Sequence, residues 1–196
     1  MLSSFLFTPF QQRLLALFLI HPERRYSYAS LRDSAGGGVS SLYHYLNVLV
    51  KAGVIVQTQG TSQAPGPQTV VTRRSRWYQA NIAHPLFPEL RSIAIKTFGV
   101  LEPIQDALRP FAGSIQRAFI FGSIVKQTDT HESDIDLMVV GNVRTGQLLM
   151  ALSEAERLTG RPIHISVYGT VEWPDAQRDP IIRTILEEPT LEVRLS

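Results

Sequence analysis

The most informative part of the chain reads Phe119-Ile120-Phe121-Gly122-Ser123 and, after ten further residues, Asp134-Ile135-Asp136-Leu137. The second part has the alternation of a β-strand, on which residues two apart project from the same face. Asp134 and Asp136 are therefore expected to point together, whereas Ile135 and Leu137 point into a core. The sequence predicts a sheet that presents two carboxylates at one place.

Two carboxylates held this close repel each other unless a cation lies between them. Their hard oxygen atoms favour Mg²⁺, which binds a few carboxylates together with phosphate oxygens. Gly122 lets the backbone approach a phosphate, and the Ser123 hydroxyl can donate a hydrogen bond to it. Neutralisation of charge by a metal is the main catalytic contribution in phosphoryl transfer. The sequence thus predicts metal ligands at Asp134 and Asp136, with two unrelated surface acids as the alternative.

Gly122-Ser123 followed by Ser133-Asp134-Ile135-Asp136-Leu137 resembles the defining motif of the DNA polymerase beta-like nucleotidyltransferases, in their minimal branch. The motif covers about sixteen residues, and the order of strands and helices is similar through most of 113–196. The resemblance implies catalytic roles for both aspartates, with Mg²⁺ and a nucleoside triphosphate, ATP being expected, as cofactors. It also implies that Lys126 contacts the triphosphate; a plain solvated lysine is the alternative.

Two positions depart from the family pattern. These nucleotidyltransferases usually carry a third carboxylate on the next strand, and the matching residue in Gly160-Arg161-Pro162-Ile163-His164-Ile165 is His164. Histidine does not replace a hard oxygen ligand of Mg²⁺, but it can act as a catalytic base, and a structural histidine is the alternative. The family also tends to have glycine where this chain has Gln127. Whether the domain turns a substrate over is therefore open.

Charge divides the chain into two parts. Residues 1–83 carry eight Lys and Arg against two Asp and Glu, and residues 84–196 carry eleven against fifteen, although the net charge is only +2. A basic part beside an acidic one indicates two modules with different partners, and the basic one is a candidate for binding a polyanion. A chance imbalance of surface charge is the alternative.

The basic part has the element order of a winged helix. Periodicity and capping residues predict three helices, over Thr8–Ile20 with Thr8 as N-cap, Ser27–Asp33 with Ser27 as N-cap, and Val39–Lys51. The third helix is expected to bury Val39, Leu42, Leu46, Leu49 and Val50. Two strands follow at Val54–Gln59 and Thr69–Gln79, with a loop at Gly60–Pro67 between them.

Residues 1–80 resemble the ArsR-like winged helix-turn-helix domains that precede this kind of nucleotidyltransferase in prokaryotic proteins. The expected domains are a winged helix-turn-helix at 1–83, a connecting helix at 84–112 and a nucleotidyltransferase fold at 113–196. The fused proteins are usually described as transcriptional regulators, so the resemblance implies double-stranded DNA as a partner.

In a winged helix the third helix lies in the major groove, and the hairpin contacts phosphates or the minor groove. The residues expected to face DNA are Ser40, Ser41, Tyr43, His44 and Asn47 on the helix and Arg73, Arg74 and Arg76 on the hairpin. Lys51 is the only cation of that helix. A surface for protein interaction is therefore the alternative to DNA binding.

Beyond the basic part, helices and strands alternate. A long amphipathic helix is expected over Glu89–Leu108, with a bend allowed before Pro103. Strands are predicted at Gln116–Phe121, Asp134–Val140 and Pro162–Tyr168, and helices at Thr145–Leu158 and Pro180–Glu187. This alternation is typical of an α/β or α+β domain, here a mixed sheet with flanking helices.

Functions from different classes fit these patterns. The first is a DNA-binding transcriptional regulator whose nucleotidyltransferase-fold domain binds Mg²⁺–NTP as a sensor or slow enzyme. The alternative is an active nucleotidyltransferase that transfers a nucleoside monophosphate to a small-molecule or protein hydroxyl. Minimal relatives that act as antitoxins imply a small helical HEPN-type protein as the partner in that case. A structural module with an inactive site is a third interpretation.

Composition excludes several other classes. The chain has no cysteine, which excludes disulfides, thiolate metal sites and cysteine nucleophiles and suits a reducing cytoplasm. The most apolar run, Leu14 to Ile20, is too short to span a bilayer. We therefore expect a cytoplasmic protein without a membrane partner, and a homodimer remains open.

Overall fold

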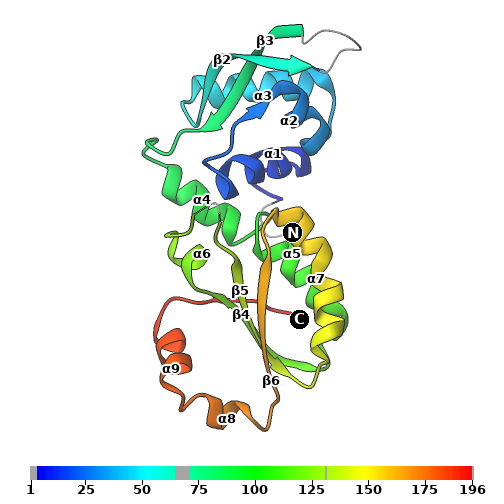
Figure 1. The fold of residues 1–196 in the computed structure, drawn as a ribbon, viewed down its shortest axis with the longest axis vertical. Coiled ribbons are helices and arrows are strands. Elements are labelled where there is room, and N and C mark those ends of the chain that lie inside the picture. Colours follow the sequence, from blue (N-terminus) through cyan, green and yellow to red (C-terminus); the bar gives the residue numbers. More distant parts are fainter. Residues whose placement is uncertain (1–3, 65–70, 131, 196) are drawn as a thin grey trace. The chain divides into compact units, whose positions relative to one another are not determined.

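The computed structural model describes residues 4–64, 71–130 and 132–195, and for residues 61–64 and 71–74 it describes the backbone only. The chain divides into two compact units, one that ends at Arg91 and one that begins at Ser92. Figure 1 shows the elements of each unit. Among the described residues, no helix is long and apolar enough to cross a membrane.

The first two helices of the N-terminal unit begin at the capping residues that the sequence predicts. α1 (Pro9–Ile20) follows Thr8, whose hydroxyl accepts a hydrogen bond from the Gln11 N–H, while the Gln11 side chain accepts one from the Thr8 N–H. This reciprocal pair satisfies two N–H groups at the helix start. α2 (Tyr28–Ala35) follows Ser27, whose hydroxyl accepts from the Ser30 N–H. Both predicted caps are confirmed.

The third helix, α3 (Val39–Lys51), has the predicted bounds. Leu42, Leu46 and Leu49 are buried as expected. The prediction for Val39 is wrong, because this residue is 61% exposed. Val39 is the first residue of the helix and lies a turn before the first buried leucine, so its side chain stays outside the core. Val50 is half-buried.

A β-hairpin follows α3. β2 (Ile55–Ala64) pairs antiparallel with β3 (Val71–Ala80), and the short β1 (Tyr26–Ser27) pairs with the other edge of β3. The predicted loop at Gly60–Pro67 is wrong in its first half, because residues 60–64 continue β2. Gly60 suits this strand because the Trp77 ring packs over it, and a Cβ there would lie 2.8 Å from the ring. The remaining loop residues and the predicted strand start at Thr69 lie outside the described residues.

The predicted long helix over Glu89–Leu108 is two helices, α4 (Phe87–Ile95) and α5 (Leu101–Leu108). A turn separates them, in which the Gly99 N–H donates to the Ala94 carbonyl. Pro103 falls in the first turn of α5, where the missing N–H of proline costs no helical hydrogen bond. A short 3₁₀ turn at Arg109–Phe111 then leads to the sheet.

The C-terminal unit contains a four-stranded mixed sheet in the order β6-β5-β4-β7. Its strands are β4 (Ile115–Phe121), β5 (Ile135–Gly141), β6 (Ile163–Tyr168) and β7 (Leu191–Glu192). β5 and β6 run parallel and are joined through α7 (Thr145–Thr159), whereas β4 is antiparallel to both of its neighbours. α5 and α7 pack together along the sheet (Figure 1).

Two further helices pack on the sheet, α8 (Trp173–Ala176) and α9 (Pro180–Glu187), the latter with its predicted bounds. Their Trp173 and Ile182 form one buried cluster with Phe119, Met138 and Val140 of the strands. Alternate residues of β5 face the other way, and Ile135 and Leu137 are fully buried there as predicted. Since Asp136 is two residues before Met138, its side chain projects on the same face of the sheet as this cluster.

Candidate functional site

The strand register places Asp136 between two other predicted site residues. β4 pairs Phe121 with Asp136, so that Gly122 is the first residue beyond the end of β4 on that side. β6 pairs His164 with Asp136 on the other side. The sheet therefore brings Gly122, Asp136 and His164 together. Asp134 lies one residue before β5 rather than in the strand, where the prediction had it.

Gly122 is held close to the Asp136 carboxylate. Its backbone has φ 77° and ψ −152°, a conformation that is essentially open to glycine alone. A Cβ at this position would overlap the Oδ2 atom of Asp136. Ser123 follows as the first residue of α6 (Ser123–Lys126), and its carbonyl accepts a hydrogen bond from the Thr128 N–H at 3.0 Å. Glycine is thus needed here for both backbone conformation and space.

The environment of the two aspartates differs. Asp134 is exposed and Asp136 is half-buried. Burial raises the pKa of the Asp136 carboxyl above its ordinary value; the nearby His164 opposes this rise and the charge of Asp134 adds to it. A cation beside the pair would relieve both the burial cost and the repulsion of the ionised carboxylates.

The two carboxylates fit a metal ion whose remaining coordination positions are filled by a bound ligand. Among the described residues, no group of three or more His, Cys, Asp or Glu side chains could hold a metal ion. Two carboxylates fit Mg²⁺, which takes oxygen ligands and commonly completes its shell with phosphate oxygens and water. Gly122, with no side chain, lets its backbone lie directly against the Asp136 carboxylate.

Lys126 and Gln127, at the end of α6, have defined roles in the fold. Lys126 forms an ion pair with Glu188, which directly follows α9, at 2.6 Å between Nζ and Oε2. A triphosphate that recruits Lys126 would have to displace this carboxylate. Gln127 ends α6 with φ 58°, and it is the one non-glycine residue with a positive φ among those described. This left-handed conformation is the physical reason why glycine suits the position.

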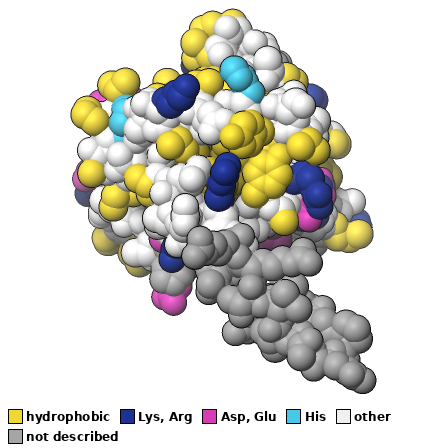
Figure 2. Space-filling model, turned by 90° about the horizontal axis from the view of Figure 1, so that it is seen from above, with side chains coloured by type: hydrophobic (Ala, Val, Ile, Leu, Met, Phe, Trp, Pro, Cys, Tyr) yellow, Lys and Arg dark blue, Asp and Glu magenta, His cyan; other side chains and the backbone are white. Residues whose placement is uncertain are grey.

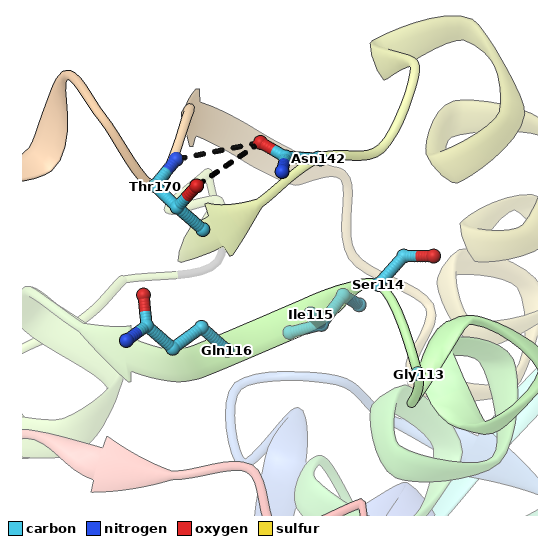
Figure 3. Close-up of a pocket in the computed structure, with 6 residues that line it drawn as sticks. All are labelled: Gly113, Ser114, Ile115, Gln116, Asn142 and Thr170. Atoms are coloured by element: carbon cyan, nitrogen blue, oxygen red, sulfur yellow. Dashed lines mark hydrogen bonds between the residues drawn. The ribbon is translucent and has the colours of Figure 1, made fainter.

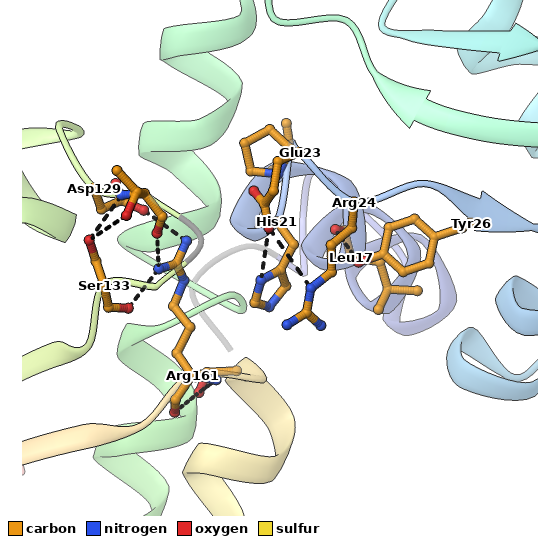
Figure 4. Close-up of polar contacts among 12 residues, drawn as sticks. Leu17, His21, Glu23, Arg24, Tyr26, Asp129, Ser133 and Arg161 are labelled. Atoms are coloured by element: carbon orange, nitrogen blue, oxygen red, sulfur yellow. Dashed lines mark hydrogen bonds and ion pairs between the residues drawn. The ribbon is translucent and has the colours of Figure 1, made fainter.

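Sequence reasoning did not identify Arg161 or its partner. The Arg161 guanidinium donates to the carbonyls of Thr130 and Ser133, each at 2.8 Å, and pairs with the Asp129 carboxylate at 2.8 Å. Figure 4 shows the guanidinium directed at Asp129 and Ser133. The side chains of Arg161 and Asp129 are only 2% and 1% exposed. Ion partners 32 residues apart leave no spacing signal that could have revealed them.

A pocket of about 430 Å³ lies at the opposite end of β4 and β5, and Figure 3 shows its lining. The lining residues are Gly113, Ser114, Ile115, Gln116, Asn142 and Thr170. None of them is charged, and the Asn142 Oδ1 atom accepts a hydrogen bond from the Thr170 hydroxyl at 3.3 Å. Because Ile115 pairs with Gly141, at the far end of β5 from Asp136, this pocket is separate from the carboxylates.

Some of the residues expected to face DNA lie close together on α3 and β3. On α3, Ser40, Ser41, Tyr43 and His44 are exposed and Asn47 is half-buried. Hydrogen bonds from Asn47 and Arg76 lower the pKa of the exposed Tyr43 hydroxyl, so Arg76 of β3 reaches α3. The side chains of Arg73 and Arg74 lie outside the described part of the chain. On the face seen in Figure 2, Lys and Arg side chains are dispersed among hydrophobic and uncharged ones.

Comparison with known proteins concerns the C-terminal unit. Among curated proteins, none matches the chain. Residues 102–183 match a family model that is described as Polymerase beta, Nucleotidyltransferase. The matched range runs from α5 into α9 and contains Gly122, Asp134, Asp136 and His164. This match supports a nucleotidyltransferase domain in the C-terminal unit.

Proposed function

We propose that the C-terminal unit binds a nucleoside triphosphate, with ATP as the expected nucleotide, together with Mg²⁺. Asp134 and Asp136 are the metal ligands, and the turn at Gly122 and Ser123 contacts the phosphates. The observation that carries this proposal is the fit of Gly122 against the Asp136 carboxylate, within a segment that matches nucleotidyltransferases. Mg²⁺ held there would neutralise charge on the triphosphate.

The chain's own residues would act on the phosphates in different ways. The Ser123 hydroxyl would donate a hydrogen bond to a phosphate oxygen, and Gly122 would let the backbone approach it. Lys126 would exchange Glu188, its partner at 2.6 Å, for a phosphate. Since Lys126 and Glu188 are both partly exposed, this exchange costs little compared with a buried pair.

Histidine at position 164, in place of the third carboxylate of the family pattern, favours a sensor over a fast enzyme. His164, which pairs with Asp136 in the sheet, occupies the position where related enzymes carry that group. Loss of a general base typically costs a factor of about 10²–10⁴ in rate. Nucleotide binding should therefore survive in this chain far better than transfer.

Calorimetric titration with Mg²⁺–ATP tests the site directly. The double variant Asp134→Asn, Asp136→Asn should lose Mg²⁺-dependent binding by about 100-fold or more, because both anionic ligands are gone. Asp175→Asn, an exposed acid of α8 in the same unit, serves as the control and should bind like the wild type. Equal affinity of the double variant and the wild type would reject the site.

The second candidate is an active transferase that modifies a small-molecule or protein hydroxyl, such as that of a small helical HEPN-type partner. The position of His164 beside Asp136 favours it, since an imidazole there can take the proton of an acceptor. Incubation with labelled nucleoside triphosphates, with and without candidate acceptors, separates the two functions. Under the sensor proposal, wild type transfers almost nothing and His164→Asp raises transfer. Brisk wild-type transfer that His164→Ala stops would make His164 a working base and would establish the transferase.

We also propose that the N-terminal unit binds double-stranded DNA, which would make the protein a transcriptional regulator. Three helices followed by a hairpin, an exposed face of α3 and the contact of Arg76 with Tyr43 support a winged helix in this role. Fluorescence anisotropy of the full chain on a labelled duplex should give affinity that falls steeply with salt. Absence of binding at low salt would instead make this face a surface for a second copy or a protein partner.

A further inference from the structure

Residues 161–164, which lead into β6, contact residues 133–136, which include both aspartates. Arg161 donates to the Ser133 carbonyl, and the Pro162 carbonyl accepts from the Ile135 N–H at 2.9 Å. His164 then pairs with Asp136 in the parallel ladder. The chain from Arg161 to His164 therefore runs alongside the residues on both sides of Asp134.

Arg161 is the charged member of this segment, and it reaches furthest into the connection between α6 and β5. It holds that connection at the Asp129 carboxylate, the Thr130 carbonyl and the Ser133 carbonyl. Hydrogen bonds of this kind, in which the donor is charged, are shorter and stronger than neutral ones. Because the ion pair is buried, water does not compete with it.

The backbone at Arg161 and the connection that it contacts are held by further hydrogen bonds. The Thr159 hydroxyl donates to the Ala155 carbonyl at 2.8 Å, and the Arg161 N–H donates back to the Thr159 hydroxyl. Within the connection, the Thr130 N–H donates to the Ser133 hydroxyl at 2.9 Å. Ser133 is thus held from two sides, and the next residue in the chain is Asp134.

We infer that Arg161 is a positioning residue of the nucleotide site. It fixes the connection between α6 and β5, so that the exposed Asp134 is presented beside Asp136 for binding Mg²⁺ with a triphosphate. The inference rests on the proposed function for its binding consequence, but the ordering of Asp134 by Arg161 stands independently. Asp136 lies inside β5, so its position does not depend on the contacts of Arg161.

The test uses the full chain with Arg161→Met, which keeps the length and apolar stem of the side chain and removes its charge. The matched control is Arg157→Met, which removes an exposed arginine paired with Glu154 on α7. With circular dichroism verifying that both are folded, we expect Arg161→Met to weaken Mg²⁺–ATP binding at least 10-fold. It should also raise the Mg²⁺ concentration needed for half-maximal binding, and Arg157→Met should change neither.

A second readout does not depend on nucleotide. Amide hydrogen exchange should accelerate in Arg161→Met at residues 129, 130, 133 and 134, while β5 beyond Asp136 keeps its protection. Arg161→Lys should restore part of the Mg²⁺–ATP affinity, because a single ammonium can keep the Asp129 pair but cannot span three acceptors. If Arg161→Met does not fold, Asp129→Asn replaces it and should show the same two changes at smaller size.

The possible failures are distinguishable. If wild type binds Mg²⁺–ATP and Arg161→Met binds equally well with the same Mg²⁺ midpoint, the positioning role is refuted and the proposed function stands. If wild type does not bind Mg²⁺–ATP, the proposed function fails and hydrogen exchange alone decides the positioning role. Unchanged exchange at residues 129, 130, 133 and 134 would then overturn it.

Discussion

Two polar regions of the molecule are built differently. One is the carboxylate end of the C-terminal sheet, with Gly122, Asp136 and His164, and the other is the α3 face of the N-terminal unit, with Tyr43, Asn47 and Arg76. At the carboxylate end, strand register sets the neighbours of Asp136, and burial raises the pKa of its carboxyl. On the α3 face, Tyr43, Asn47 and Arg76 meet through side-chain hydrogen bonds, and Tyr43 is exposed. A main-chain ladder tolerates little change, whereas an exposed side-chain cluster can rearrange at low cost.

The largest expected effect probes the tight packing of the carboxylate end. Gly122→Ala places a Cβ against Asp136 in a conformation that alanine avoids, so unfolding free energy should fall by about 1–3 kcal/mol. Mg²⁺–ATP affinity should fall with it. Denaturant unfolding measures the first effect and calorimetry the second.

Gly146→Ala is the matched control for that variant. Gly146 lies in the first turn of α7 with no atom near the position of a Cβ, so alanine should be neutral or stabilising by up to about 1 kcal/mol. If both glycine variants behaved alike, the contact between Gly122 and Asp136 would not be specific.

The next effect concerns the exposed cluster on α3. Arg76→Ala should reduce the slope of log affinity for duplex DNA against log salt by about one, with a several-fold loss of affinity. The fold should not change, because Arg76 is exposed. Arg32→Ala removes an exposed arginine at the end of α2 and is the control. An unchanged salt slope in Arg76→Ala would remove Arg76 from the DNA contacts.

A smaller effect tests the electrostatics of Asp136 in metal-free buffer. Because the folded-state pKa of Asp136 is raised, its ionised form destabilises the fold at neutral pH, and protonation on acidification removes that cost. Asp136→Asn should therefore be equally or more stable than wild type at pH 7, by no more than about 1 kcal/mol.

This advantage should shrink as pH falls through the raised pKa, and thermal melting across pH measures it. Excess Mg²⁺–ATP should reverse the order, since only wild type gains binding energy. An advantage that grows on acidification would contradict the direction of the pKa change.

The smallest expected effect concerns the end of α6. Gln127→Gly relieves a left-handed backbone conformation and should stabilise the fold by about 0.5–1 kcal/mol. The same substitution at Gln147, in the first turn of α7, should destabilise it, because glycine loses more conformational freedom in a helix. Denaturant midpoints that shifted in the same direction for both variants would exclude the conformational explanation.

Features with a local cause could be predicted from the sequence. The caps at Thr8 and Ser27 follow from side-chain hydrogen bonding within one turn, and the sequence predicts both. The alternation around Asp136 predicts buried Ile135 and Leu137 because a strand has a period of two. The match of His164 to the neighbouring strand position relied on a family pattern, and the observed register pairs it with Asp136.

Features with a weak local signal or with distant partners could be predicted only in part or not at all. The sequence allows a bend before Pro103, but the apolar pattern continues through the break between α4 and α5, where the Gly99 N–H donates to the Ala94 carbonyl. β2 is longer than its hydrophobic pattern predicts, because pairing with β3 continues through polar residues. The partners of Lys126 and Arg161, Glu188 and Asp129, are surface-type residues whose pairing is decided by the tertiary fold.

The two connections of β5 have a consequence for the order in which the site is assembled. β4 and β5 form an antiparallel pair with residues 122–134 between them, whereas β6 reaches β5 only after the whole of α7. Closing a longer loop costs more entropy, and parallel pairing forms slowly for that reason. We therefore expect Asp136 to meet Gly122 early in folding, and to meet His164 only after the chain through β6 has left the ribosome. Until that moment Arg161 is absent from the connection, and Asp134 is free to move.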